Sequence, residues 1–430
     1  MRIAIIGSGI SGLGAAWLLH DTHDITVYEA AGRIGGHSHT IDVDYDGSSI
    51  PVDTGFIVYN EKNYTNLTAL FKTIGVTSEA SDMSFAVSTG GGALEWGSDS
   101  LSTVFAQRRN LFRPRFLSTL VEIQRFNKQA PEDLRRGILQ GMTLNAYLDR
   151  NGYSKKFRAN YLFPMGGAIW SMPASGMQDF PAESFISFCN NHFLLSRDRP
   201  KWQTVRGGSR EYVKKLTAPF ADRIHVNAEV VRVGRENGKV LVQDITGRRA
   251  LFDHVIIAAH GDQALRMLEN PDRAERDILG CVHYAPNIAY VHRDPALMPQ
   301  MRKVWSSWNY ISQEAVDGRI MVSYWMNRLQ NIHRDKPLFI TLNPLTPPRP
   351  ELTFASIEYA HVQYDMDCLR AQQQLNSIQG VRNIWYCGAW TAHGFHEDGL
   401  CSGLNIAERI SGKQPPWAKK TGYNFQEAAE

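Results

Sequence analysis

The sequence predicts an α/β protein with two domains, one built on an open parallel sheet and one of mixed α+β structure. Three observations predict it. A buried-strand pattern, a glycine-rich turn and a helical pattern follow one another in the first twenty residues, and apolar strand patterns return at 253–259 and 384–387. The stretches between them mix helical patterns with short strand patterns typical of an antiparallel sheet. A chain of 430 residues also exceeds what one hydrophobic core usually supports.

The first element is a complete dinucleotide-binding unit of the Rossmann-like type. Residues 2–6 form a short apolar run with β-branched side chains, which favours a buried parallel strand. The run Gly7-Ser8-Gly9-Ile10-Ser11-Gly12 follows at once, and 13–20 has a helical pattern. Strand, G-x-G-x-x-G and helix in this order separate the motif from a chance match. A secretory signal over 3–19 is the alternative, but three phased glycines would weaken its helix and no A-x-A site follows.

Each residue of this unit has a physical role in holding a pyrophosphate. Gly7 permits the tight turn, Gly9 lets the backbone approach the phosphates, and Gly12 lets helix and strand pack closely. Ser11 lies in the same turn, so we count it with the cofactor-binding candidates. Glu29 ends the next apolar run near the spacing expected for the acid that binds a ribose 2′-hydroxyl. A glutamate there would repel a 2′-phosphate, which disfavours NADP.

A second glycine motif, Gly32-Arg33-Ile34-Gly35-Gly36, follows the ribose acid. It resembles the second FAD motif of the flavin amine oxidase and phytoene desaturase superfamily, and the resemblance implies FAD as cofactor. Arg33 can form charge-assisted bonds to phosphate, while Gly35 and Gly36 let the backbone approach the cofactor. Gly55, in a D-x-G that the superfamily places near the flavin, is either a flavin contact or an ordinary turn glycine.

Composition limits the class of protein. No uninterrupted apolar run of membrane length appears, and the net charge of +3 is too small to indicate a nucleic-acid partner. The five cysteines are widely spaced without a C-x-x-C pair, which favours a reducing compartment and no structural metal site. We therefore expect a cytoplasmic protein, with peripheral contact to the inner face of the membrane as a further option. The oligomeric state does not follow from the sequence.

The pattern along the chain, together with the resemblance, predicts a discontinuous FAD-binding domain. We assign it residues 1–75, 205–270 and 376–415. Residues 76–204 and 271–375 form the substrate domain, and 416–430 form a C-terminal tail. In the superfamily a strand of the middle cofactor segment gives a backbone contact to adenine, and the resemblance implies Val230 for this role.

The segment 101–129 is basic and aromatic. It carries six Lys and Arg residues against the single acid Glu122, with phenylalanines and leucines between them. Such a segment suits peripheral contact with an anionic membrane. The other interpretation is a helical cap with a solvated charged face, since Pro114 breaks the helical pattern.

The third cofactor element runs from 383 to 412 and resembles the C-terminal FAD motif of the superfamily. A strand ending at Gly388 precedes a loop, and a helix is predicted from Leu400 to Ile410. Ala389 stands where many relatives have an acid. The resemblance implies that Gly388, Asp398 and Gly399 bind the cofactor.

The loop 393–399 also supplies the candidate catalytic residues by family placement. His396 is the first candidate for the base, with His393 and Glu397 behind it; bonding that only shapes the loop is the alternative. A base of ordinary histidine character would give the rate an inflection near pH 6.5.

The runs 394–399 and 169–173 resemble a bacterial branch of predicted NAD/FAD-binding proteins whose genes accompany fatty-acid-modifying enzymes. The resemblance implies an FAD-dependent oxidoreductase that desaturates a fatty-acyl chain, with hydride passing to flavin N5 from a carbon about 3 to 3.5 Å away. A flavin amine oxidase and a redox-neutral double-bond isomerase stay open, although signatures for covalent flavin attachment and an aromatic amine cage are not recognisable. A flavin-bearing partner of an acyl-modifying enzyme, without turnover of its own, is the non-enzymatic alternative.

Overall fold

The central sheet of the first half of the molecule is parallel throughout, in the order β10-β2-β1-β14-β20. The computed structural model that shows it describes residues 1–196, 200–312 and 321–418. β1 (Arg2–Ile6) pairs with β2 (Asp24–Tyr28) on one side and β14 (His254–Ile257) on the other. β10 (Ile224–His225) and β20 (Ile384–Tyr386) form the edges. The apolar side chains of β1 are buried because helices or strands cover both faces of the sheet.

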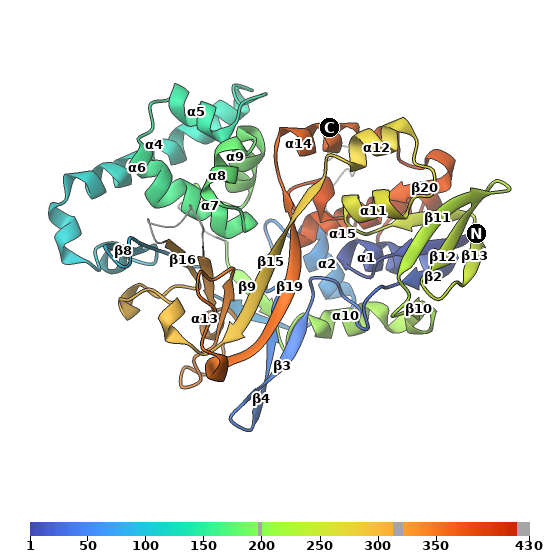
Figure 1. Cartoon of the computed structure of the whole chain (residues 1–430), viewed down its shortest axis with the longest axis horizontal. Helices are drawn as coiled ribbons and strands as arrows, with labels where there is room; N and C mark the ends of the chain where they lie inside the picture. The colour runs from blue at the N-terminus through green and yellow to red at the C-terminus, as the bar shows by residue number, and fades with distance from the viewer. Residues whose placement is uncertain (197–199, 313–320, 419–430) are drawn as a thin grey trace.

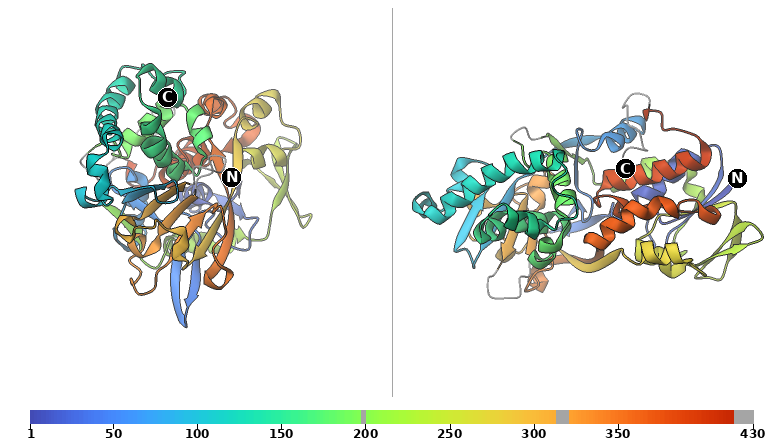
Figure 2. Two further views of the ribbon diagram at one scale, coloured as in Figure 1. Left: turned by 60° about the vertical axis from the view of Figure 1, so that its left-hand side comes forward. Right: turned by 90° about the horizontal axis from the view of Figure 1, so that it is seen from above.

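Two helices from opposite ends of the sequence pack on this sheet. α1 (Ile10–Leu19) follows the first glycine turn, and α15 (His396–Ser411) lies against it, as Figures 1 and 2 show in dark blue and red. A side chain on Gly403 would collide with the carbonyl oxygen of Ser11, so the glycine sets the distance between the helices. α2 (Thr65–Thr73) and α10 (Arg210–Thr217) complete this layer.

A seven-stranded mixed sheet forms the second domain, in the order β19-β15-β18-β17-β16-β7-β8. Its long strands β15 (His283–His292) and β19 (Thr353–Gln363) pair antiparallel and extend from the parallel sheet toward the second domain (Figure 1). The other strands are β7 (Phe85–Thr89), β8 (Leu94–Gly97), β16 (Trp308–Ser312), β17 (Met321–Trp325) and β18 (Phe339–Leu342). Of the strands that alternation predicts between Tyr284 and Leu342, 287–292 and 338–341 fall on β15 and β18, whereas 303–308 covers part of a 3-10 helix, Arg302–Val304, and ends where β16 begins.

Helices with an aromatic core cover one end of this sheet. α4 (Pro114–Arg135) is the longest, and α7 (Phe163–Trp170) and α9 (Ala182–Asn191) pack beside it. Pro114 does not break the helical pattern as expected: it stands in the first turn of α4, where a missing N–H costs nothing. The remaining helices are α3 (Leu101–Val104), α5 (Leu144–Arg150), α6 (Lys155–Phe157), α8 (Ala174–Asp179), α11 (Gly261–Met267), α12 (Arg273–Leu279), α13 (Met326–Leu329) and α14 (Met366–Gln374).

Three smaller sheets complete the fold of the described residues. The turn sequence Asp46-Gly47 between two strand patterns predicts a hairpin, and β3 (Thr40–Tyr45) and β4 (Ser48–Asp53) form it, with both turn residues in left-handed conformations. The strands β5 (Val58–Asn60), β9 (Trp202–Val205) and β6 (Ser78–Ser81) form one three-stranded sheet, and β11 (Val230–Glu236), β12 (Lys239–Asp244) and β13 (Arg249–Phe252) form another.

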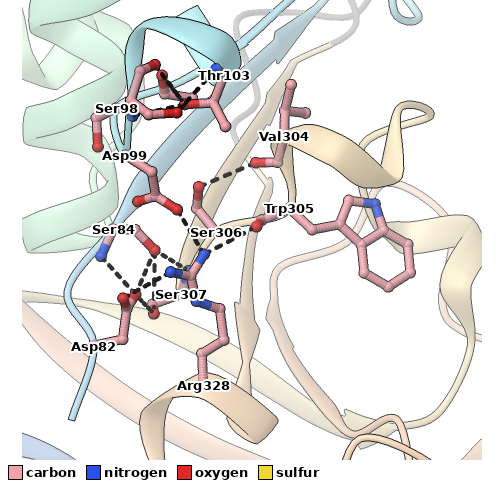
Figure 3. Close-up of polar contacts among 12 residues, drawn as sticks. Asp82, Ser84, Ser98, Asp99, Thr103, Val304, Trp305, Ser306, Ser307 and Arg328 are labelled. Atoms are coloured by element: carbon pink, nitrogen blue, oxygen red, sulfur yellow. Dashed lines mark hydrogen bonds and ion pairs between the residues drawn. The ribbon is translucent and has the colours of Figure 1, made fainter. Parts of the chain in front are cut away.

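Arg328 joins the sheet to the segment that leads into α3. Its guanidinium donates to Asp82 at 2.7 Å and to Asp99 at 2.8 Å, as Figure 3 shows. Ser84 and Ser307 donate to the same Asp82 carboxylate. The cluster fixes the chain on either side of β7 and β8.

The predicted fold class, α/β with a Rossmann-like domain and a mixed second domain, is confirmed. The strands of the parallel sheet come from three separate stretches of the chain, and the domain boundaries given above stay a prediction. Most of the predicted tail, 416–430, lies outside the described residues. Its first part is packed, because Trp417 is buried, stacks on Trp17 and donates to Asn66.

Candidate active site

A cavity of about 1710 Å³ lies where the carboxyl ends of the parallel strands meet the second domain. Ligand pockets usually measure about 300–1,000 Å³, so this one has room for a cofactor and a second molecule. We call its two parts the cofactor end and the apolar chamber. The cofactor end is lined by Gly9, Glu29, Arg33, Gly36, Val230 and Gly388. The apolar chamber is lined by Trp96, Leu120, Ile123, Tyr161, Ile169 and Phe188, among others.

The first glycine turn forms one wall of the cofactor end. Gly7 has a φ of +105°, and a Cβ there would lie 2.5 Å from the carbonyl oxygen of Ala258. A Cβ on Gly12 would collide with the Gly7 carbonyl oxygen, so Gly12 serves packing and does not line the cavity. Gly9 and Ser11 do line it, and a Cβ on Gly9 would project into open space. Gly9 therefore leaves room for a ligand beside the N-terminus of α1.

The second glycine motif packs directly on the first. A Cβ on Gly36 would lie 2.9 Å from Gly9 Cα, and a Cβ on Gly35 would lie 2.8 Å from the Ser38 carbonyl oxygen. Gly36 lines the cavity and Gly35 does not. The Arg33 guanidinium also lines it and donates to the Gly36 carbonyl oxygen at 2.8 Å. Gly55 lines the cavity too, and a side chain there would collide with the His37 carbonyl oxygen.

Glu29 and Val230 stand at the far part of the cofactor end. The Glu29 carboxylate accepts bonds from the Ser8 backbone N at 3.0 Å and the Ser8 hydroxyl at 2.5 Å. It also accepts one from the Ala31 N at 2.8 Å. Val230 begins β11 and lines the same region. These positions agree with the expected ribose and adenine contacts, whose roles stay proposals.

The C-terminal motif differs from the expectation at its helix. α15 begins at His396, four residues before the predicted Leu400, because the buried Asp398 carboxylate accepts from the Phe395 N at 2.9 Å and caps the helix. Asp398 and Gly399 do not line the cavity; a Cβ on Gly399 would lie 2.9 Å from Ile10 Cγ2. Of the three residues expected to bind the cofactor, Gly388 lines the cavity. Asp398 caps the start of α15, and Gly399 lets α15 pack against Ile10.

His396 is the one residue of the three catalytic candidates that lines the cavity. Its ring stacks on Phe56 with centroids 3.8 Å apart, and its Nε2 lies 2.7 Å from the Tyr212 hydroxyl and 3.1 Å from Ser38 Oγ. Burial lowers the pKa of His396 to about 3. The expected inflection near pH 6.5 therefore does not apply to this residue, because its imidazole is neutral throughout that range.

Glu397 and His393 do not lie beside His396 on the cavity wall. The Glu397 carboxylate accepts from the backbone N of Asn66 at 2.7 Å and of Leu67 at 2.9 Å, so it caps the N-terminus of α2. Burial raises its pKa. The carbonyl oxygen of His393 accepts from Trp170 Nε1, and its side chain does not line the cavity. Neither residue lines the cavity, and their catalytic roles stay predictions.

Three histidines that the sequence did not single out line the cofactor end. The His37 ring lies 5.7 Å from His361 and 6.5 Å from His260, measured between centroids. Burial and the neighbouring imidazoles lower the pKa of His37 well below its usual range, and burial lowers the pKa of His361 to about 4. No spacing signal could have found them, because they come from three distant segments. In the described ranges no group of His, Cys, Asp or Glu is arranged to hold a metal ion.

His192 lines the apolar chamber. Its Nδ1 donates to the Phe188 carbonyl oxygen at 3.1 Å, and its ring stacks on Phe188 at 3.9 Å. Burial lowers its pKa to about 4. The aromatic residues around His192 in the sequence predict a core histidine with a satisfied hydrogen bond; Nδ1 fits this prediction, although the same ring forms part of the cavity wall.

The residues of the cofactor end fit an FAD molecule. No side chain caps the N-terminus of α1, and its first turn carries no acid, so its N–H groups are available to an anion. The Arg33 guanidinium has no carboxylate partner in the described part of the chain. Gly9 leaves the space that a pyrophosphate needs. Together with the carboxylate of Glu29, which accepts from the Ser8 N of the same glycine turn, this donor and acceptor set suits a dinucleotide.

Fold and cavity together define a flavin-binding oxidoreductase. A model of the family described as flavin containing amine oxidoreductase matches residues 10–293. The chain belongs to this family, and FAD is its cofactor. The predicted resemblance is confirmed by this match.

Individual relatives are distant. A probable zeta-carotene desaturase of Synechococcus elongatus is 24% identical over 331 residues, which cover 72% of this chain and 63% of that protein. The solved structures include an engineered putrescine oxidase, with a TM-score of 0.68 and 17% identity over 96% of this chain and 99% of the other. A CLA-producing fatty acid isomerase from P. acnes has a TM-score of 0.68 and 16% identity over 95% and 98%. These two structures share the fold.

The described residues include no helix that is both long and apolar enough to span a membrane.

Proposed function

We propose that this FAD-dependent oxidoreductase acts on an apolar lipid and desaturates a fatty-acyl chain held in the apolar chamber. The observation that carries the proposal is the chemistry of the chamber wall. Aliphatic and aromatic side chains form most of it, and the described lining residues that α4, α7 and α9 supply include no carboxylate; the carboxylates of the cavity are Glu29, Glu229 and the exposed Glu358 of β19. Lys128 is the cation that α4 adds to this lining. A cationic amine would find no counter-ion on these three helices, whereas an acyl chain with an acidic end matches the apolar wall and Lys128.

A few polar atoms in the lining lack a partner in the described structure. They are Asn127 Oδ1, Trp308 Nε1 and Tyr364 Oη. Ligand sites of this kind are mostly apolar, with a small number of polar groups that fix orientation. Asn127 neighbours Lys128 on α4, so this end of the chamber suits the polar end of the substrate. The chain then runs inward past Ile169 and Phe188 toward the cofactor end.

When bound, FAD would supply the two-electron acceptor for the substrate's hydride, with dioxygen or a quinone as the final oxidant. The protein holds the chain and keeps water from it, since Trp170, Phe188 and Phe395 form a contiguous aromatic wall. A saturated carbon is a poor hydride donor, so we expect an allylic or branched position. The second proton leaves the adjacent carbon, and the neutral imidazoles of the cavity wall, His192 and His396 among them, can accept it.

The test is anaerobic mixing of the purified holoenzyme with an unsaturated fatty acid, followed through the loss of oxidised-flavin absorbance. We expect bleaching, and a product two hydrogens lighter by mass spectrometry. Putrescine, mixed under the same conditions, is the matched amine. Bleaching by putrescine but not by lipid would overturn the proposal in favour of an amine oxidase, and a lipid product of unchanged mass with a shifted double bond would identify an isomerase. No change in any lipid would favour the non-enzymatic alternative.

A further inference from the structure

Large apolar side chains are exposed at the end of the molecule formed by η1 (Arg108–Phe112) and the first two turns of α4. Phe112 is 86% exposed and Val121 68%, with Leu111 and Leu117 also exposed. Figure 1 and the right-hand view of Figure 2 place this cyan segment at the extremity opposite the N-terminus. Single exposed apolar residues need no explanation, but four within eleven residues of chain form a patch that does.

The same segment is positively charged. Arg108, Arg109, Arg113 and Arg115 are all exposed, and none has a carboxylate partner in the described part of the chain. No Asp or Glu occurs between Asp99 and Glu122. Asp99 is itself bound by Arg328, as Figure 3 shows, and the Glu122 carboxylate accepts from the N and hydroxyl of Ser154. The patch therefore presents arginines beside apolar side chains with no nearby free acid.

One stripe of α4 connects this patch with the apolar chamber. Leu117, Val121, Gln124 and Lys128 are spaced i, i+4, i+7 and i+11, so they lie in line along one side of the helix. The first two are exposed in the patch, and the last two line the cavity while exposed to solvent. The chamber thus opens along the same side of α4 that carries the apolar patch.

We propose that residues 108–121 dock on an anionic phospholipid bilayer, so that a lipid chain enters the apolar chamber from the membrane along α4. Phe112, Leu111 and Val121 would lie at the boundary of headgroups and acyl chains, and the arginines would bind lipid phosphates. Charge complementarity selects this occupant, since guanidinium groups beside apolar side chains match an anionic lipid surface. The part of this proposal in which a lipid chain enters the chamber rests on the proposed function. The part in which the protein docks on the bilayer does not.

The test is cosedimentation of the full-length holoprotein with vesicles of mixed phosphatidylglycerol and phosphatidylcholine, compared with vesicles of phosphatidylcholine alone. We expect binding to the mixed vesicles that weakens as salt is raised, and little binding to the neutral ones. In the double variant Phe112→Ser with Arg115→Glu, affinity should fall on the order of a hundredfold, because an apolar anchor is lost and one charge is reversed. Both side chains are exposed, and a glutamate in the first turn of α4 suits the helix, so folding should be kept.

The matched control is Ile245→Ser with Arg248→Glu, which makes the same chemical changes at the exposed turn between β12 and β13. This variant should bind vesicles like the wild type. Equal binding of the wild type to neutral and anionic vesicles, or equal losses in both double variants, would overturn the docking proposal. Self-association of the wild type without vesicle binding would overturn it in favour of a contact between copies of the chain.

Failure of this proposal and of the proposed function are distinguishable. Vesicle binding without any lipid-dependent bleaching of the flavin would leave the docking standing and refute the substrate assignment. The reverse outcome has two parts: the protein does not bind vesicles, and fatty acid in solution bleaches the flavin equally in the wild type and in the Phe112→Ser, Arg115→Glu variant. That outcome would refute the docking and leave the substrate assignment standing.

Discussion

The two ends of the cavity are built in different ways. At the cofactor end part of the wall is backbone without side chains: Gly7, Gly9, Gly36 and Gly388 line it, and Gly12 packs behind the turn. In the apolar chamber the wall is made of side chains, such as Ile123 from α4, Ile169 from α7 and Phe188 from α9. The difference teaches how each end tolerates change. A backbone wall fails when any side chain is added, whereas a side-chain wall can be reshaped one residue at a time.

The largest effect should come from adding a side chain to the backbone wall. Gly9→Val should weaken FAD binding by more than about a hundredfold, because the new methyl groups would fill the space left for the pyrophosphate. Gly9 has ordinary extended dihedrals, so the variant should fold. FAD content after purification and reconstitution measures the effect, with the exposed Thr22→Val as control. A variant that retains FAD would show that the wall at Gly9 is not a cradle.

A smaller loss should follow removal of the acid expected to bind the ribose. Glu29→Ala should weaken FAD binding by about 1.5 to 3 kcal/mol, roughly tenfold to a hundredfold, through loss of a charge-assisted bond to ribose. Fluorescence titration of the apoprotein with FAD gives the dissociation constant. Glu229→Ala removes the same charge from an exposed position at the same end and should change little. Equal affinities in the wild type and Glu29→Ala would exclude the ribose role.

A larger side chain in the wall of the apolar chamber should slow the reaction with lipid without changing FAD binding. Ile123→Trp should leave FAD content unchanged and slow lipid-dependent flavin reduction about tenfold, because the indole takes up space in the chamber. Ser118→Trp, on the exposed side of the same helix, serves as the control. Stopped-flow bleaching with a soluble fatty acid measures the rate. Loss of FAD in Ile123→Trp would mean that the two ends are not independent.

The smallest expected effect is that of pH on the rate of flavin reduction. The pKa of His192 is lowered to about 4 and that of His396 to about 3, so both imidazoles are neutral above pH 5.5. Because both pKa values are lowered, each imidazole is protonated, and stops being a neutral base, only in more acid solution. Flavin reduction should therefore be flat between pH 5.5 and 8, and His396→Gln should leave the shape of the profile unchanged. An inflection near pH 6.5 that disappears in His396→Gln would contradict the burial of this group.

The sequence was sufficient to predict the glycine turns of the cofactor end. Gly7, Gly9 and Gly12 meet steric demands that neighbours in the chain impose on one another, so their spacing alone carries the prediction. The hairpin at Asp46 and Gly47 followed for the same reason, because a two-residue turn has few allowed conformations. The helix start at His396 was missed, since a capping carboxylate from Asp398 is a matter of side-chain geometry that the run of residues does not display.

Only the tertiary structure decided what surrounds the substrate. It turned Glu397 away from the cavity to cap α2, and it brought His37, His260 and His361 together from segments more than one hundred residues apart. It also placed one stripe of α4 both on the chamber wall and beside the exposed patch of residues 108–121. The physical reason is that a backbone cradle is set by consecutive residues, whereas a side-chain wall is set by which distant elements pack against one another.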